Sequence, residues 1–317
     1  MKTLLKVAAA IILLAIVVFA LMIGYVVFFK PGIAVEEVKI DATPERLSRG
    51  KYLVENVAQC AACHSERDWS LYSAPVKDGT IGKGGEPFDQ KQGFPGAYYA
   101  QNMTPHHLKD WSDGEVLRAV TSGVSRDGRP LFPVMPYLSF GKMDREDVYS
   151  MVAYIRSLQP IANDPPVSKS DFPMSIIIHM IPKKGEFGAM PPRTDKVAYG
   201  QYLANAASCA ECHTPDNRGQ IIESELYSGG RSFLLPDGTR VVSKNITPHE
   251  KGIGAWTEEE FIERFKRYEN QSSPVPAGQL QTMMPWTGYA GMTREDLAAI
   301  YAYLRTVKPL KGVEMQK

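Results

Sequence analysis

The sequence predicts an all-α chain in which two copies of one helical domain follow a single N-terminal membrane-spanning helix. Three observations lead to this prediction: an uncharged apolar run near the N-terminus, a long internal repeat, and helical spacing of apolar residues in both copies. The length of 317 residues and the composition, 44% hydrophobic and 22% charged, fit two globular domains.

The N-terminal run, Val7 to Phe29, contains no charged residue over 23 positions. A helix rises about 1.5 Å per residue, so about 20 residues cross the roughly 30 Å hydrocarbon core of a membrane. Lysines precede the run and Glu36 and Glu37 follow it, which places its N-terminus in the cytoplasm. The run does not end in the small residues of a cleavage site, although a cleaved signal peptide is the alternative. We therefore expect residues 1–30 to be an uncleaved signal-anchor in the cytoplasmic (inner) membrane, with the rest of the chain on the periplasmic side.

The internal repeat defines the domain organisation. Residues 49–64, RGKYLVENVAQCAACH, match residues 199–213, YGQYLANAASCAECH. Residues 133–158 align without gaps on residues 282–307, and an NxTPH sequence occurs once in each copy. The predicted segments are a linker at 31–43, a first domain at 44–160, a linker at 161–193, a second domain at 194–310 and a tail at 311–317.

Each copy is predicted to contain three helices, in which apolar residues recur at helical spacing. The middle helix begins with a capping box, in which a hydroxyl and an acidic residue three positions later satisfy free backbone N–H groups. Strand signals are sparse, which favours an all-helical fold. The expected helix starts are Thr43, Ser112 and Asp144 in the first copy, and Thr257 and Thr293 in the second.

All four cysteines fall in two short motifs, Cys60-Ala-Ala-Cys63-His64 and Cys209-Ala-Glu-Cys212-His213. Two thiols at this spacing can add to the two vinyl groups of one haem, with the adjacent histidine beneath the iron as proximal ligand. A disulfide in each pair is possible in an oxidising compartment, but it leaves the repeated histidine unexplained. A thioredoxin-like site needs a βαβ context, and a zinc site needs four closed ligands. The motifs therefore predict two covalently attached haem c groups.

Two methionines are the predicted sixth ligands of the irons. Met135 and Met284 each lie 75 residues after the first cysteine of their copy, and each precedes a proline in a loop before the last helix. A thioether on such a loop can bind iron opposite the histidine, which raises the reduction potential. The predicted metal ligands are therefore His64 with Met135 and His213 with Met284.

Other methionines and histidines fit less well. Met143 and Met292 are also repeated, but they lie at the entry to the last helix. Met283 aligns with a valine, and Met103 aligns with an isoleucine, which cannot bind iron. Bis-histidine ligation is the remaining alternative, and it would use His106 and His249, whose distances from the first cysteine of their copies are unequal.

At these motifs the sequence resembles a known family. Both copies resemble class I cytochrome c domains, in the order helix, CxxCH, intervening region, Met-Pro and terminal helix. The order NxTPx, Trp-Ser/Thr, Met-Pro and last helix is similar to that in the cytochrome c subunits of membrane-bound alcohol and gluconate dehydrogenases. The resemblance covers residues 44–158 and 194–307. It implies two tandem class I cytochrome c domains that form a membrane-tethered electron carrier on the periplasmic side.

The predicted function is the relay of single electrons by a dihaem c-type cytochrome. Its partner is expected to be a membrane or periplasmic dehydrogenase, a quinol oxidiser or a terminal oxidase of a respiratory chain, and the chain itself is expected not to be an enzyme. A dihaem peroxidase is the alternative, but peroxide cleavage needs an open iron position, whereas both copies keep Met-Pro at the same spacing. The formal net charge of +1 and the lack of a basic cluster argue against a nucleic-acid partner. GKGG at 82–85 is expected to be a flexible turn.

Overall fold

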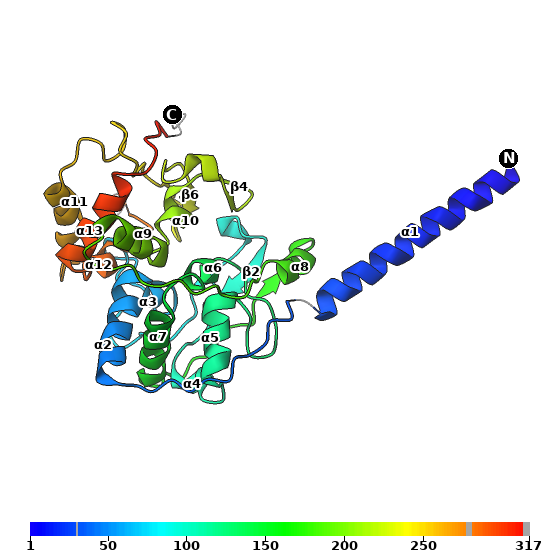
Figure 1. Ribbon diagram of the computed structural model, residues 1–317, viewed down its shortest axis with the longest axis horizontal. Coiled ribbons are helices and arrows are strands. Elements are labelled where there is room, and N and C mark those ends of the chain that lie inside the picture. Colours follow the sequence, from blue (N-terminus) through cyan, green and yellow to red (C-terminus); the bar gives the residue numbers. More distant parts are fainter. Residues whose placement is uncertain (30, 277–280, 313–317) are drawn as a thin grey trace.

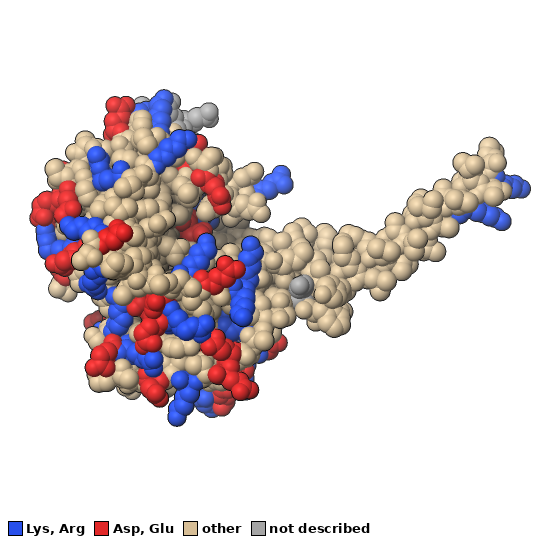
Figure 2. All heavy atoms as spheres, viewed as in Figure 1, with Lys and Arg blue, Asp and Glu red and all other residues tan. Residues whose placement is uncertain are grey.

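A single long helix, α1 (Lys2–Phe29), precedes the body of the protein and projects away from it (Figure 1). The computed structural model describes residues 1–29, 31–276 and 281–312. No residue of α1 is buried, and among the described residues it is the one helix that is long and apolar enough to cross a membrane. Its charged side chains, Lys2 and Lys6, lie at the end away from the body (Figure 2). The apolar helix predicted from the sequence is therefore present.

The rest of the described chain forms two halves with corresponding helices, which occupy separate lobes in Figure 1. The helical elements of the first half are α2 (Pro44–Tyr52), the π-helical turn η1 (Leu53–Val57), α3 (Cys60–Cys63), the 3-10 turn η2 (Gln90–Gln92), α4 (Pro105–Leu108), α5 (Asp113–Ser122), α6 (Tyr137–Phe140) and α7 (Arg145–Ser157). Those of the second half are α9 (Lys196–Ala206), α10 (Cys209–His213), the 3-10 turn η4 (Glu223–Glu225), α11 (Glu258–Lys266), α12 (Trp286–Tyr289) and α13 (Arg294–Leu304).

The predicted helix starts are confirmed by side chains that accept hydrogen bonds from free backbone N–H groups. Complete capping boxes begin α5 and α11, as the paired hydroxyl and acid predicted. A proline at the first position of α2 adds to that start, because its fixed φ suits a helix and no N–H is needed there. The N-caps are Thr43 for α2, Ser112 for α5, Asp144 for α7, Thr257 for α11 and Thr293 for α13.

The first copy of the Cys-Cys-His region is one residue longer than the second, and a π-helical turn absorbs the difference. In the first half the Ala58 N–H donates to the Leu53 carbonyl, five residues earlier, at 2.7 Å. In the second half the Ala207 N–H donates to the Leu203 carbonyl, four residues earlier, at 2.8 Å. A single π turn holds one extra residue inside an otherwise α-helical segment. Each motif therefore follows its helix at an equivalent point, although the first copy has one more residue.

Helix pairs form the core of each half, with α2 packed against α7 and α9 packed against α13. Burial of apolar side chains from these faces supplies the main stabilisation of such a core. Apolar residues recur at helical spacing in α7 and α13, and among them Tyr301 is half-buried. The others are buried, namely Val148, Met151, Val152 and Ile155 of α7 and Leu297, Ile300 and Leu304 of α13.

Short antiparallel strands are also present. The fold is therefore mainly helical, and it differs in these strands from the all-helical fold that the sequence predicts. Strands of two to four residues offer too few positions for an alternating pattern to be detected in a sequence. The sheets, in strand order, are β1 (Pro87–Phe88), β2 (Gly96–Tyr99) and β3 (Lys169–Ser170); β4 (Asp216–Asn217) and β5 (Gln220–Ile221); and β6 (Ser232–Leu234) and β7 (Arg240–Val242).

The segments on either side of the first half pack against it. In the earlier segment, the Ile40 N–H donates to Asp113 at 2.8 Å. In the later segment, β3 extends the sheet formed by β1 and β2, and α8 (Met174–Ile177) with the 3-10 turn η3 (Ile178–Met180) contacts α1. The later segment therefore belongs to the structure of the first half as well as joining the halves.

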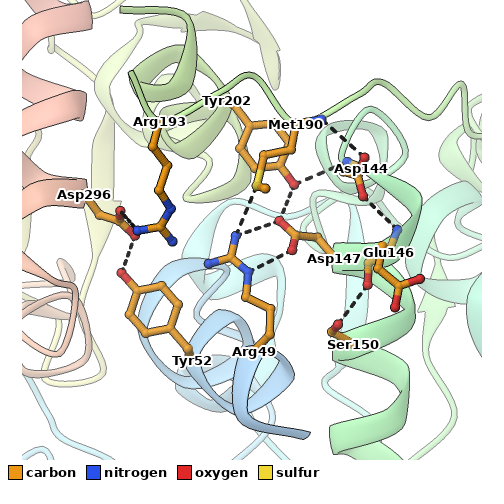
Figure 3. A network of polar contacts seen from close by, with 10 residues as sticks. All are labelled: Arg49, Tyr52, Asp144, Glu146, Asp147, Ser150, Met190, Arg193, Tyr202 and Asp296. Carbon is orange, nitrogen blue, oxygen red and sulfur yellow. Dashed lines mark hydrogen bonds and ion pairs between the residues drawn. The ribbon is translucent and has the colours of Figure 1, made fainter. Parts of the chain in front are cut away.

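The two halves are joined by a reciprocal pair of tyrosines, the first of which is Tyr52. Its hydroxyl donates to Asp296 Oδ2 at 2.6 Å (Figure 3). It also accepts from the Thr293 N–H at 3.2 Å. Thr293 is the N-cap of α13 and Asp296 lies in its first turn, where free N–H groups need acceptors. A tyrosine of the first half therefore helps to cap the last helix of the second.

Tyr202 makes the same contacts in the opposite direction. Its hydroxyl donates to Asp147 Oδ2 at 2.5 Å and accepts from the Asp144 N–H at 3.3 Å, at the start of α7. Arg49 donates two further hydrogen bonds to the Asp147 carboxylate, at 2.7 and 2.8 Å (Figure 3). Burial and the Asp147 carboxylate raise the pKa of Tyr202, which keeps it a neutral donor. The halves therefore dock by exchanging equivalent contacts.

Candidate functional site

Each Cys-Cys-His motif begins a short helix after an abrupt change in backbone direction. The preceding residues, Gln59 and Ser208, have φ of +54° and +53°, in the left-handed region. This conformation ends one helix and redirects the chain into α3 or α10. All four cysteine thiols are free. Within the described ranges, no three His, Cys, Asp or Glu side chains are grouped as they would be around a metal ion.

The motif thiols lie in surroundings that favour the neutral form. Burial raises the pKa of Cys60 to about 12, that of Cys63 to about 11 and that of Cys209 to about 12. Redox-active cysteines have lowered pKa values, because the thiolate is the nucleophile. These environments are therefore unlike a thioredoxin-type site.

Both motif histidines are held through the same ring nitrogen. His64 Nδ1 lies 2.7 Å from the Gln101 carbonyl oxygen, and His213 Nδ1 lies 2.7 Å from the Lys244 carbonyl oxygen. A carbonyl can only accept, so Nδ1 carries the proton and Nε2 keeps its lone pair. Burial lowers the pKa of both imidazoles, which favours this neutral form. Proteins orient histidine metal ligands in this way.

The repeated NxTP sequence holds these carbonyl groups in place. Asn102 directly follows Gln101, and its Oδ1 accepts from the N–H and the hydroxyl of Thr104, both at 2.8 Å. Asn245 and Thr247 form the same two bonds at the same distance in the second half. These bonds fix the backbone that faces each histidine.

A glycine on the other side of this backbone makes the approach possible. Gly84, with φ of +73°, donates its N–H to the His64 carbonyl at 2.8 Å. A Cβ atom on Gly84 would lie 2.6 Å from both the Gln101 carbonyl carbon and the Asn102 nitrogen. Gly229, with φ of +76°, shows the same two approaches at 2.6 Å in the second half. Gly84 of the GKGG sequence therefore makes a close backbone contact, and Gly82 lies in a turn closed by the bond from the Lys83 N–H to the Thr80 carbonyl, at 3.0 Å.

A cavity of about 1220 Å³, lined by the first half, the end of α1 and the segment that carries α8 and η3, brings the predicted ligands of the first half together. Small-molecule sites commonly enclose roughly 300–1,000 Å³, so this cavity has room for a large planar cofactor. Cysteine, imidazole and thioether groups share it with apolar walls. The lining residues include Cys60, Cys63, His64, Met135, Val120, Leu131 and Phe140.

The predicted methionine ligands lie in matching turns. Met135 with Pro136 directly precedes α6, and Met284 with Pro285 directly precedes α12. Both methionine side chains belong to half-buried residues. In each turn the N–H two residues after the methionine donates to the methionine carbonyl, at 2.8 Å in the first half and 2.9 Å in the second. The two turns therefore share one backbone form.

Comparison with known proteins identifies the second half. Residues 197–308 match the family model described as cytochrome c. They form a cytochrome c domain. Over 284 residues the chain is 26% identical to the cytochrome c subunit of an alcohol dehydrogenase (quinone) from Gluconobacter oxydans, with 84% of this chain and 56% of the relative covered.

Two further relatives carry cytochrome names. The chain is 26% identical over 282 residues to the gluconate 2-dehydrogenase cytochrome c subunit of Pantoea cypripedii, covering 82% of this chain and 59% of the relative. It is 26% identical over 265 residues to a diheme cytochrome c-type protein of Cereibacter sphaeroides, covering 80% and 83%. The chain spans a little more than half the length of the two dehydrogenase subunits. The predicted resemblance to such subunits is confirmed.

Tyr289 is a residue near the cytochrome motifs that sequence reasoning missed. Burial raises its pKa well above the usual value. The short helix α12, which carries Tyr289, packs against η1 of the first half, so the halves meet beside this side chain. The gap-free repeat aligns Tyr289 with Phe140, which lines the first cavity. That alignment was the available signal, but it could not show that the halves meet here.

The alternative iron ligands have other roles. Met143 and Met292 are 0% and 1% exposed and pack in the core before the last helices. His106 Nε2 lies 3.4 Å from Asp164 Oδ1. His249 Nδ1 accepts from a backbone N–H two residues later, at 3.1 Å.

Proposed function

We propose that the chain is a dihaem c-type cytochrome that transfers single electrons for a dehydrogenase. The observation that carries the proposal is the bond from each motif histidine, His64 and His213, to a backbone carbonyl, because it leaves Nε2 free to bind a metal. In the first half the cavity beside His64 also contains two cysteines and Met135. These donors suit a covalently attached haem.

The two haem sites would use equivalent residues. Each haem supplies the reversible uptake of one electron. The chain's own groups attach it, hold the imidazole neutral and in one orientation, and surround it with apolar walls that limit access of water. The proposed residues are Cys60, Cys63, His64 and Met135 for the first haem, and Cys209, Cys212, His213 and Met284 for the second.

We further propose that residues 44–160 and 194–310 are tandem class I cytochrome c domains. The family match in the second half supports this division, and so do the gap-free repeat and the equivalent helix pairs. Residues 1–30 would anchor both domains on the periplasmic side of the inner membrane, since the apolar helix follows two lysines.

The proposed electron donor is a dehydrogenase in or at the membrane, and the proposed acceptor is a component of a respiratory chain. Relatives that cover most of this chain are named as cytochrome c subunits of alcohol and gluconate dehydrogenases, which supports the donor. The protein's own role is transfer, with the substrate chemistry assigned to the partner.

The proposal is tested by counting the haems that survive denaturation. Haem should remain on the protein band in denaturing electrophoresis, and the intact mass should exceed that of the polypeptide by two haems. Replacing both Cys60 and Cys63 by alanine should leave one. A mass equal to that of the bare polypeptide would contradict the proposal.

A second measurement separates a carrier from a peroxidase. If Met135 and Met284 bind the irons, the oxidised protein should be six-coordinate and low-spin at both, with a thioether-to-iron band near the red edge of the visible spectrum. A high-spin iron that binds small ligands in both redox states, together with rapid turnover of peroxide, would favour the enzyme instead.

A further inference from the structure

Ser73, a buried residue of the first half, contacts the Met-Pro turn of the second half. Its hydroxyl donates to the Met284 carbonyl at 2.8 Å and accepts from the Trp286 N–H at 2.7 Å. Pro285 lies between these two residues and has no N–H. One hydroxyl therefore holds the polar backbone groups on both sides of the proline.

Gln281 fastens the same two segments together. The Ser73 N–H donates to Gln281 Oε1 at 2.8 Å, and Gln281 Nε2 donates to the Leu71 carbonyl at 2.8 Å. Ser73 is 0% exposed and Gln281 is 6% exposed. Water cannot replace a lost partner at such depth, so each of these bonds matters more than a surface bond.

The backbone of this loop is strained into one orientation. Ser73 and Ala74 have φ of +68° and +42°, which non-glycine residues rarely adopt. Such conformations persist where the surroundings hold them, and they are concentrated at functional positions. Arg67 fixes this backbone conformation. Its Nε donates to the Ala74 carbonyl at 2.9 Å, and its Nη2 donates to the Ser73 carbonyl at 3.0 Å.

The arrangement is specific to the second half. In the part of the chain that the structure describes, no side chain bonds the Met135 carbonyl or the Tyr137 N–H in the matching turn of the first half. The loop that carries Ser73 is four residues longer than its counterpart, counted from the motif histidine to the glycine that bonds the histidine carbonyl. The extra length belongs to the loop that reaches across to Met284.

We propose that Ser73 is a positioning residue for the second haem, through which the first half sets the geometry of Met284 toward its iron. The inference rests on the proposed function, which takes Met284 as a ligand. A turn held at both ends presents the thioether in one place. Without the hydroxyl the turn can move, and an added ligand displaces the thioether more easily.

Imidazole competition tests this in the oxidised full-length holoprotein in detergent, with loss of the thioether-to-iron band as the readout. Ser73→Ala should lower the apparent Kd for imidazole about tenfold at one iron, as the loss of one buried hydrogen-bond partner implies (about 1.4 kcal/mol), and leave the other iron unchanged. Ser73→Gly also lacks the hydroxyl, and glycine adopts a positive φ readily, so its apparent Kd for imidazole should fall by the same factor. This variant replaces Ser73→Ala if the alanine variant does not fold.

Tyr202→Phe is the matched control. It also removes a buried hydroxyl that donates and accepts across the halves, but it acts at the start of α7, away from the Met284 turn. Its apparent Kd for imidazole should equal that of the unmodified protein. A tenfold effect in this variant would overturn the inference, because weakened docking in general would then be the cause.

Met284→Ala separates failure of this inference from failure of the proposed function. If Met284→Ala loses half of the band while Ser73→Ala binds imidazole as the unmodified protein does, the positioning role is overturned and the ligand assignment stands. If Met284→Ala keeps the whole band, the ligand assignment fails, and Ser73 has no thioether to position.

Discussion

Replacing Gly84 by alanine is expected to destabilise the first half and to disturb the partner of His64. The new Cβ would lie 2.6 Å from the Gln101 carbonyl carbon and the Asn102 nitrogen, whereas ordinary contacts begin at 3.4 Å. An alanine in the left-handed conformation costs about 1–2 kcal/mol. Forcing atoms into a packed region costs about 1–3 kcal/mol more. The free energy of unfolding should therefore fall by about 2–5 kcal/mol in total.

Gly79→Ala provides the control, because Gly79 has φ of +72° but no atom within 4 Å of the position that a Cβ would take. It should lose only the backbone contribution of about 1–2 kcal/mol. Denaturant titrations followed by far-ultraviolet circular dichroism in detergent give both values, and the visible spectrum reports on the haem beside His64. Equal losses in the two variants would refute the tight contact at Gly84. A destabilised Gly84 variant with an unchanged spectrum would refute its link to the histidine.

Three further results are expected. Met135→Ala should open one iron to small ligands and lower its reduction potential, as optical redox titration would reveal, whereas an unchanged potential would exclude this ligand. Deleting residues 1–30 behind a cleavable export signal should give a soluble, haem-loaded protein; a natural chain that already begins near residue 31 would contradict the anchor. Glu66 is paired with Lys77 and Lys83, which lowers its pKa from 4.5 to about 2. Because the folded-state value is the lower one, its stabilising effect is complete above pH 4.5 and is lost toward pH 2. In denaturant titrations Glu66→Gln should therefore be less stable than the unmodified protein above pH 4.5, and the difference should shrink and disappear toward pH 2.

Short-range signals predicted the helices well. The N-caps at Ser112 and Thr257 depend on residues three positions apart, so local chemistry alone locates them. The repeat also located matching Met-Pro turns, because corresponding residues of two similar halves occupy corresponding elements. The π turn was harder to predict, since the extra residue in the first copy could equally have been placed in a loop.

Contacts between the halves could not be predicted from the sequence. Ser73 and Met284 are 211 residues apart, and Tyr52 and Asp296 are 244 residues apart, so no local pattern relates them. The partner of His64 is a backbone carbonyl, which has no residue type of its own. In retrospect the repeated NxTP sequence marked the position of that carbonyl.

Tyr52 and Tyr202 each bond the last helix of the other half, so neither half keeps all its hydrogen bonds when it is separated from the other. If the chain were divided between its halves, Asp296, which is 0% exposed, would lose the Tyr52 donor at 2.6 Å, and Tyr202 would face water instead of the start of α7. A half present as a single copy would need another hydrogen-bond donor for the aspartate in the first turn of its last helix. Each half therefore depends on the other for a hydrogen bond at the start of its last helix.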